Sequence, residues 1–136
     1  MLDDLVTMFS CTPFRVGACI GLLYASVMFP GGEGNPPRGA SWLTLYPVLH
    51  RGMVVLPISA ESALHIHHWM IYLPVCMACS VMAIAADEEG KGGEGHSRIL
   101  PAATAGFAMV MALHGLAMYD DRFVIKTRNP YHPTPQ

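Results

Sequence analysis

Charge is what this sequence has little of. Only 13% of its residues are Asp, Glu, Lys or Arg, which is about half the share typical of soluble domains. The formal net charge is -2, and no two basic residues are adjacent. A nucleic-acid-binding protein needs a basic patch or stripe. We therefore expect no nucleic-acid partner.

Catalytic and targeting signatures are also missing from the sequence. It has no glycine-rich phosphate loop and no nucleophile motif of the known kinds, which favours a non-catalytic role. The chain starts Met1-Leu2-Asp3-Asp4, whereas a secretory signal starts with basic residues. We expect the first apolar helix to act as its own insertion signal.

Apolar residues are abundant instead. They make up 52% of the 136 residues, and a soluble fold would need a core of unusual size for this length. We predict an all-α, multi-pass integral membrane protein that forms one domain over residues 1–136. Its three-helix transmembrane bundle should lie in a lipid bilayer. The expected spans are 13–29, 63–86 and 99–118.

The first span carries a stripe of small residues. Gly17, Gly21 and Ala25 recur at a spacing of four, so they lie on one face of a helix. Small residues let helix backbones approach closely in a membrane, where no hydrophobic force drives helices together. We predict that this stripe packs against another helix. The other two spans should form an antiparallel hairpin, because a charged, glycine-rich loop joins them.

Residues 41–62 are apolar enough for a further span but are interrupted. Arg51 lies at the centre of the segment and a proline lies on either side of it. A central Arg costs about 2.5–3.5 kcal/mol on insertion scales. We therefore expect an interfacial or re-entrant segment, with residues 53–56 extended. The proline-rich tail 129–136 is expected to form an extended C-terminal arm.

The run Leu64-His65-Ile66-His67-His68-Trp69-Met70 is the strongest functional signal. Placing ionisable side chains so close to lipid costs free energy, so their presence by default indicates a functional site. Helical phase places His65 and His68 on one side of the second span and His67 on the opposite face. Folding the hairpin brings residues of the third span to the same end. The predicted cluster is His65, His68, His114 and Asp121.

Several chemistries could use this cluster. All four residues could bind a copper or iron ion, and His65, His68 and His114 could hold haem or chlorophyll as axial ligands. The same groups could instead form hydrogen bonds that only join the helices, or could transfer protons. Cys76 and Cys79 lie in mid-span, where small packing residues are expected rather than reactive thiolates.

Two function classes follow from these observations. In the first, the protein is a small non-catalytic membrane subunit that packs through its small-residue stripe and loops into a larger assembly, with or without a His-ligated cofactor. In the second, it is a stand-alone membrane metal or haem protein that uses His65, His68 and His114 in electron transfer or oxidation. The missing catalytic signatures favour the first class, and with it partners that are other membrane subunits.

Overall fold

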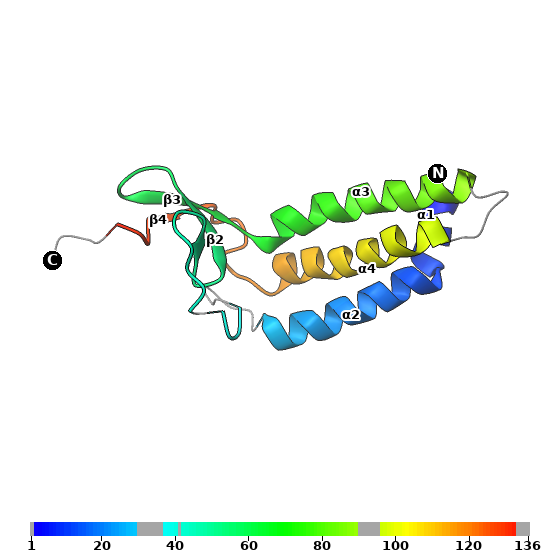
Figure 1. Ribbon diagram of the computed structural model, residues 1–136, viewed down its shortest axis with the longest axis horizontal. Coiled ribbons are helices and arrows are strands. Elements are labelled where there is room, and N and C mark those ends of the chain that lie inside the picture. Colours follow the sequence, from blue (N-terminus) through cyan, green and yellow to red (C-terminus); the bar gives the residue numbers. More distant parts are fainter. Residues whose placement is uncertain (1, 30–36, 41, 90–95, 133–136) are drawn as a thin grey trace.

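Helices make up most of the molecule. The computed structural model describes residues 2–29, 37–40, 42–89 and 96–132. Figure 1 shows three long helices side by side, with a short helix folded across one end of the bundle and a small sheet beyond the other. In chain order the helices are α1 (Leu2–Ser10), α2 (Thr12–Met28), α3 (His68–Glu89) and α4 (His96–Ala117).

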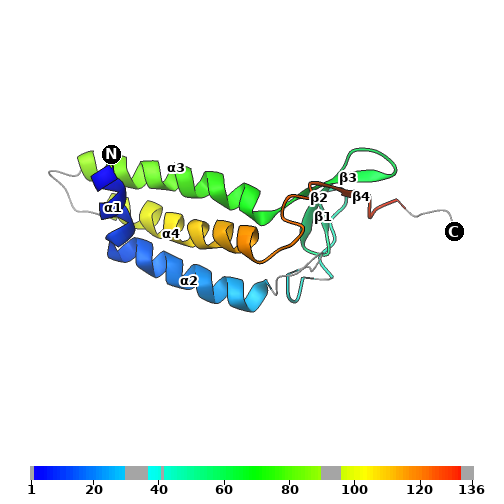
Figure 2. The ribbon, with the colours of Figure 1, turned by 180° about the vertical axis from the view of Figure 1, so that it is seen from behind.

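Helix α4 is the centre of the bundle, because it packs against both α2 and α3. The view from behind in Figure 2 shows the same arrangement. Alanines fill much of the space between the helices, since Ala83 of α3 and Ala102 and Ala105 of α4 are fully buried in one cluster. Alanine lets helices lie close together without voids.

The predicted stripe of small residues packs inside this chain. Gly17, Gly21 and Ala25 are all buried on α2. A Cβ atom at Gly17 would overlap the backbone carbonyl of Ala103 in α4, and one at Gly21 would lie 3.1 Å from the carbonyl oxygen of Phe107. The stripe therefore joins α2 to α4, and this contact leaves no room there for a helix of another subunit.

Two helices, α3 and α4, are each long and apolar enough to cross a membrane. Helices α1 and α2 pass the same test only together, and they are bent by 62° at their junction. In the apolar stretch of α3, only 11% of the residues are buried within the protein. Large apolar side chains such as Met77 and Val81 are mostly exposed. These surfaces are compatible with a lipid environment.

The prediction of an all-α protein is wrong in one region. Residues 49–66, together with 126–128, form a four-stranded antiparallel sheet of order β1-β2-β3-β4. The first three strands pair with their neighbours in the chain, whereas the last one pairs over a long range, because Ala63 pairs with Thr127. Only this last pairing has no local signal in the sequence. The strands are β1 (Leu49–His50), β2 (Met53–Pro57), β3 (Ser62–Ile66) and β4 (Lys126–Arg128).

A tight turn accounts for the charge that interrupts segment 41–62. Arg51 and Gly52 have φ angles of 52° and 79° and connect β1 to β2. Two consecutive positive φ angles are typical of a two-residue hairpin turn that matches the twist of the strands. Arg51 is exposed at this turn. The predicted interfacial or re-entrant segment is thus a hairpin, and the expected extended stretch 53–56 lies in β2.

Two further boundaries differ from the prediction. Helix α3 begins at His68 rather than at residue 63, because residues 62–66 are used as β3. The start of the predicted arm 129–136 is attached to the sheet. Asn129 is buried and its side-chain amide donates a 2.8 Å hydrogen bond to the carbonyl of Ser59. Residues 133–136 of the predicted arm lie outside the described residues.

The packing of α2 on α4 predicts which of two glycine substitutions destabilises the protein more. Gly17→Ala should lower the free energy of unfolding by about 1–3 kcal/mol, because the added methyl group meets backbone that cannot move aside alone. Gly21→Ala should lower the free energy of unfolding by less than Gly17→Ala does, since the added Cβ would make tight contacts without overlapping the backbone. Thermal unfolding in detergent micelles measures both.

The matched control is Ile20→Ala, at a side chain that is 54% exposed on the same helix. Its effect should stay within about 0.5 kcal/mol. Equal stability of Gly17→Ala and the unaltered protein would contradict the close approach of α2 and α4.

Candidate metal site between the sheet and the bundle

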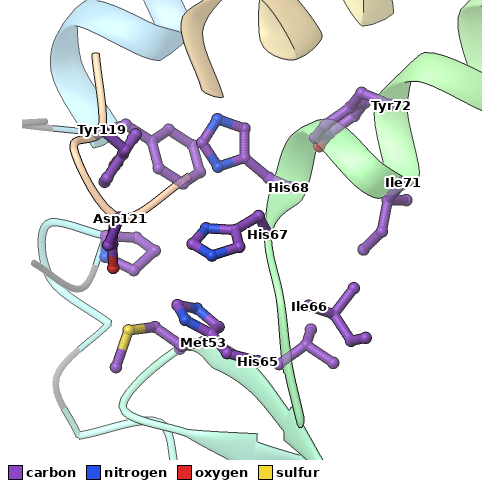
Figure 3. A pocket seen from close by; sticks show the side chains of 13 residues that line it. Met53, His65, Ile66, His67, His68, Ile71, Tyr72, Tyr119 and Asp121 are labelled. Carbon is purple, nitrogen blue, oxygen red and sulfur yellow. The ribbon is translucent and has the colours of Figure 1, made fainter. Parts of the chain in front are cut away.

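Two histidines meet where β3 leads into α3. His65 lies in β3, and His67 follows in the last extended residues before the helix. Residues two apart along an extended chain point to the same side, so the rings of His65 and His67 stack, with centroids 4.2 Å apart. Figure 3 shows these two rings one above the other. The prediction that His67 faces away from His65 is therefore wrong.

Asp121 completes this group from the loop that follows α4. One nitrogen of His65, one nitrogen of His67 and one carboxylate oxygen of Asp121 all lie within 4.8 Å of one another. Figure 3 shows the Asp121 side chain beside the two rings. His67 is only 5% exposed. Two imidazoles and a carboxylate in this arrangement are a ligand set for a transition-metal ion.

One oxygen of the Asp121 carboxylate has no partner. The Oδ1 atom is buried and makes no hydrogen bond. Leaving a buried acceptor unpaired costs about 1–3 kcal/mol, and more when the group is charged. A bound cation would remove this penalty.

A backbone contact sets the proton position on His67. The Nε2 atom lies 3.2 Å from the carbonyl oxygen of Val124, and a carbonyl can only accept. Nε2 therefore carries the proton and donates, which leaves the lone pair on Nδ1. Metal-binding histidines usually donate their second ring N–H to a carbonyl or carboxylate in this way.

The same loop is attached to the histidine segment at two more points. The indole N–H of Trp69 donates a 2.9 Å hydrogen bond to the carbonyl of Arg122. The backbone N–H of His65 donates a 2.7 Å hydrogen bond to the carbonyl of Ile125. Three contacts thus hold residues 122–125 against residues 65–69. They position Asp121 although it is far from the histidines in the sequence.

The surroundings of His65 keep its ring neutral. Burial lowers the pKa of His65 below its usual value, and the nearby ring of His67 lowers it further, while Asp121 acts in the opposite direction. A neutral imidazole offers the lone pair that a metal ion needs. His65 should therefore remain able to bind a cation at neutral pH.

His68 and His114 form a separate contact inside the end of the bundle. Their ring centroids lie 5.8 Å apart, and both rings also pack near Phe29 and Tyr119. His68 lies against Gly115, where an added Cβ would be 2.8 Å from its Nε2 atom. The structure brings His65 and Asp121 together and places the ring of His68 against that of His114, although His68 also lines the cavity beside His65 and Asp121. The Nε2 atom of His68 and the Nδ1 atom of His114 are buried without a hydrogen bond.

Sequence reasoning missed His67, and a signal for it was available. The order His-x-His puts both rings on one side of an extended chain, whereas the helical interpretation separated them.

Cys76 and Cys79 of α3 form no disulfide. Cys79 packs against the buried cluster of the bundle, and neither thiol belongs to the group of three possible ligands.

A cavity of about 190 Å³ adjoins the site. His65, His67 and Asp121 line one part of it, and mostly apolar side chains line the rest. The cavity lies where α2 ends and α3 begins, because Phe29 and Ile71 both contribute to its wall. The possible ligands thus border an open space and are not enclosed on all sides by protein.

Comparison with known proteins gives no analogy for this site. No protein-family model, no curated protein and no solved structure matches the chain. The function must therefore be argued from the residues of the site.

The loop contacts make a prediction for Trp69. Trp69→Phe keeps an aromatic ring but removes the hydrogen bond to the carbonyl of Arg122. The loop should then open more often, and the amide proton of His65, which bonds to the same loop, should exchange about three- to tenfold faster. This range corresponds to about 0.6–1.4 kcal/mol, which is the net contribution expected of one hydrogen bond. Hydrogen exchange measured by NMR in micelles gives the rate.

The control for this variant is Trp42→Phe, at a ring that is 79% exposed. It should leave the exchange of the His65 amide unchanged. An unchanged rate in Trp69→Phe as well would show that this contact does not hold the loop.

Proposed function

We propose that this protein is a small membrane metal protein that binds one divalent transition-metal ion through His65, His67 and Asp121. The observation that carries the proposal is the convergence of the three ligand atoms within 4.8 Å. This assignment keeps the stand-alone metal protein of the sequence analysis but changes its ligands. His67 replaces His68 and His114.

A purely structural role for these residues accounts less well for their contacts. If the histidines and the aspartate only joined the chain segments, the Asp121 carboxylate should accept hydrogen bonds from the nearby rings. Its Oδ1 atom is buried without a hydrogen bond, and His67 donates to a backbone carbonyl instead. A bound cation would contact Asp121 Oδ1 and the lone pairs of both imidazole rings at once. These contacts support the proposal of a metal site.

The donor set narrows the choice of ion. Imidazole nitrogens suit iron, copper and zinc, and two histidines with one carboxylate are typical of non-haem iron(II) sites. Zinc sites with three protein ligands also keep a position for water or substrate. A site with three protein ligands therefore favours an ion that can bind a further molecule over a purely structural ion.

Metal binding requires a small movement. Ligands about 2.0–2.2 Å from one ion lie roughly 3–3.6 Å apart in a tetrahedral arrangement. The three atoms must therefore approach by about an ångström from separations of up to 4.8 Å. Asp121 belongs to a loop, where such a shift needs no change in the helices.

Haem or chlorophyll fits this region less well than a single metal ion does. Pockets for drug-sized ligands enclose about 300–1,000 Å³, whereas the cavity beside the site has about 190 Å³. His68 and His114 could face each other across a haem only if the aromatic rings around them moved apart. The available space thus supports an ion and not a macrocycle.

The membrane part of the proposal rests on the apolar helices. Helices α3 and α4 are long enough to span a bilayer, and their outward side chains suit lipid. Membership in a larger assembly loses one of its two arguments, because the stripe lies against α4 at Gly17 and Gly21, while the missing catalytic signatures still agree with it. We therefore favour a protein that carries its own site over a subunit that only supports others.

Metal titration of the purified protein tests the proposal. In detergent micelles the protein should bind one Co²⁺ or Zn²⁺ per chain. His67→Ala and Asp121→Asn should each weaken binding by more than about 100-fold, beyond the 10–100-fold typical of losing an outer-shell partner. Equilibrium dialysis with elemental analysis measures the stoichiometry and the affinity.

Matched controls separate the two possible ligand sets. Asp120→Asn changes an exposed neighbour of Asp121 and should have no effect. His114→Gln should also keep the metal, although the sequence analysis assigned His114 as a ligand. Loss of the metal in His114→Gln but not in His67→Ala would contradict the proposed site.

A further inference from the structure

The cavity beside the three ligands has two chemically different parts. One part contains His65, His67 and Asp121, and the other walls combine apolar side chains such as Phe29, Val54, Ile66 and Ile71 with the rings of His68, Tyr72 and Tyr119. A ligand that fills the cavity therefore offers one polar group to the metal. The rest of that ligand meets mainly apolar and aromatic side chains.

Charge determines which polar group fits best. A divalent ion with one Asp carboxylate and two neutral imidazoles has a residual charge of about +1. His65 and His67 add no negative charge, so this excess is uncompensated. In a partly apolar cavity a charge is screened less than in water. An anionic oxygen ligand neutralises the site, whereas an alcohol or amide does not.

Size limits the apolar part of the ligand. A dry cavity of about 150 Å³ can hold a benzene molecule. The cavity of about 190 Å³ therefore has room for one ring or a short chain together with a carboxylate. A long acyl chain in an extended form would not fit within this volume and would extend beyond the cavity.

The position of the cavity indicates where such a ligand comes from. Ile71 belongs to the first turn of α3, lines the cavity and is 44% exposed. The wall of the cavity is thus also part of the outer surface at the end of an apolar helix. A molecule that is apolar at one end and charged at the other collects at this level of a membrane.

We propose that the metal ion binds the carboxylate of a small apolar monocarboxylic acid, whose body occupies the cavity. This inference rests on the proposed function, because the open coordination positions of the ion supply the anion site. The apolar walls supply the preference for a ring or short chain over acetate. The substrate class is thus a membrane-partitioning monocarboxylate of about the size of benzoate.

Co²⁺-loaded protein in micelles tests the inference, since the visible spectrum of the ion responds to a new ligand. Benzoate should produce a saturable change. Acetate, which lacks the apolar body, and benzamide, which lacks the charge, should each bind at least about tenfold more weakly. The same spectrum first shows whether Co²⁺ is bound at all.

Cavity-filling variants locate the benzoate. Val54→Trp should weaken benzoate binding by about tenfold or more, as overpacking a filled space does, and should leave the Co²⁺ spectrum and acetate binding unchanged. Leu56→Trp is the control, because it lies two residues further along β2 and does not line the cavity. Ile71→Trp, on the half-exposed wall, gives a second obstruction if Val54→Trp does not fold.

The outcomes distinguish the two proposals. If Co²⁺ does not bind, the proposed function is wrong. If Co²⁺ binds but benzoate causes no saturable change, the metal site stands and the monocarboxylate inference is wrong. Equal affinities for acetate and benzoate, or no effect of either Trp variant in the cavity, would show that the apolar walls do not contact the ligand and would also overturn the inference.

Discussion

The backbone changes from extended to helical between His67 and His68, and this change decides where each histidine of the run lies. Up to His67 the side chains alternate, so His65 and His67 share one side. From His68 onward the side chains follow the helical repeat, and this ring points into the end of the bundle. One short run of histidines thereby enters two environments, one at the sheet and one between helices.

The bundle and the sheet fix the two sides of the site independently. Packing of α3 against α4, with Gly115 lying against His68 and Trp69, places the start of the loop after α4 beside the start of α3. Pairing of β3 with β4 then returns the chain along the strand that carries His65. Asp121 lies in the connection between α4 and β4. Its place beside the histidines follows from these two attachments.

Local sequence signals predicted the helices well and the sheet poorly. The small-residue stripe of α2 and the long apolar runs of α2 and α4 are local features, and these two helices lie within three residues of the expected limits. Helix α1 was not predicted, and α3 begins five residues later than expected. The fourth strand depends on pairing between residues such as Ser62 and Arg128, which no local pattern records, and the other three strands pair locally in a run that was interpreted partly as helix. Arg51 was interpreted as a charge at the membrane, but it occupies an exposed hairpin turn.

The candidate site, like the fold, was predicted from the sequence only in part. His65 and Asp121 were expected to meet, because folding the helical hairpin brings their segments to one end of the bundle. His67 was excluded because the helix was extended backward through residues 63–67, where β-strand and helix patterns both fit the apolar run. The carbonyl of Val124, which sets the tautomer of His67, belongs to a loop whose course depends on tertiary contacts alone.

X-ray absorption spectroscopy of the zinc-loaded protein identifies the atoms bound to the ion. A site formed by His65, His67 and Asp121 should give two imidazole nitrogens and oxygen ligands at about 2.0–2.2 Å. A sulfur ligand at about 2.3 Å would assign the ion to the cysteines of the helices. That result would contradict a site formed by His65, His67 and Asp121.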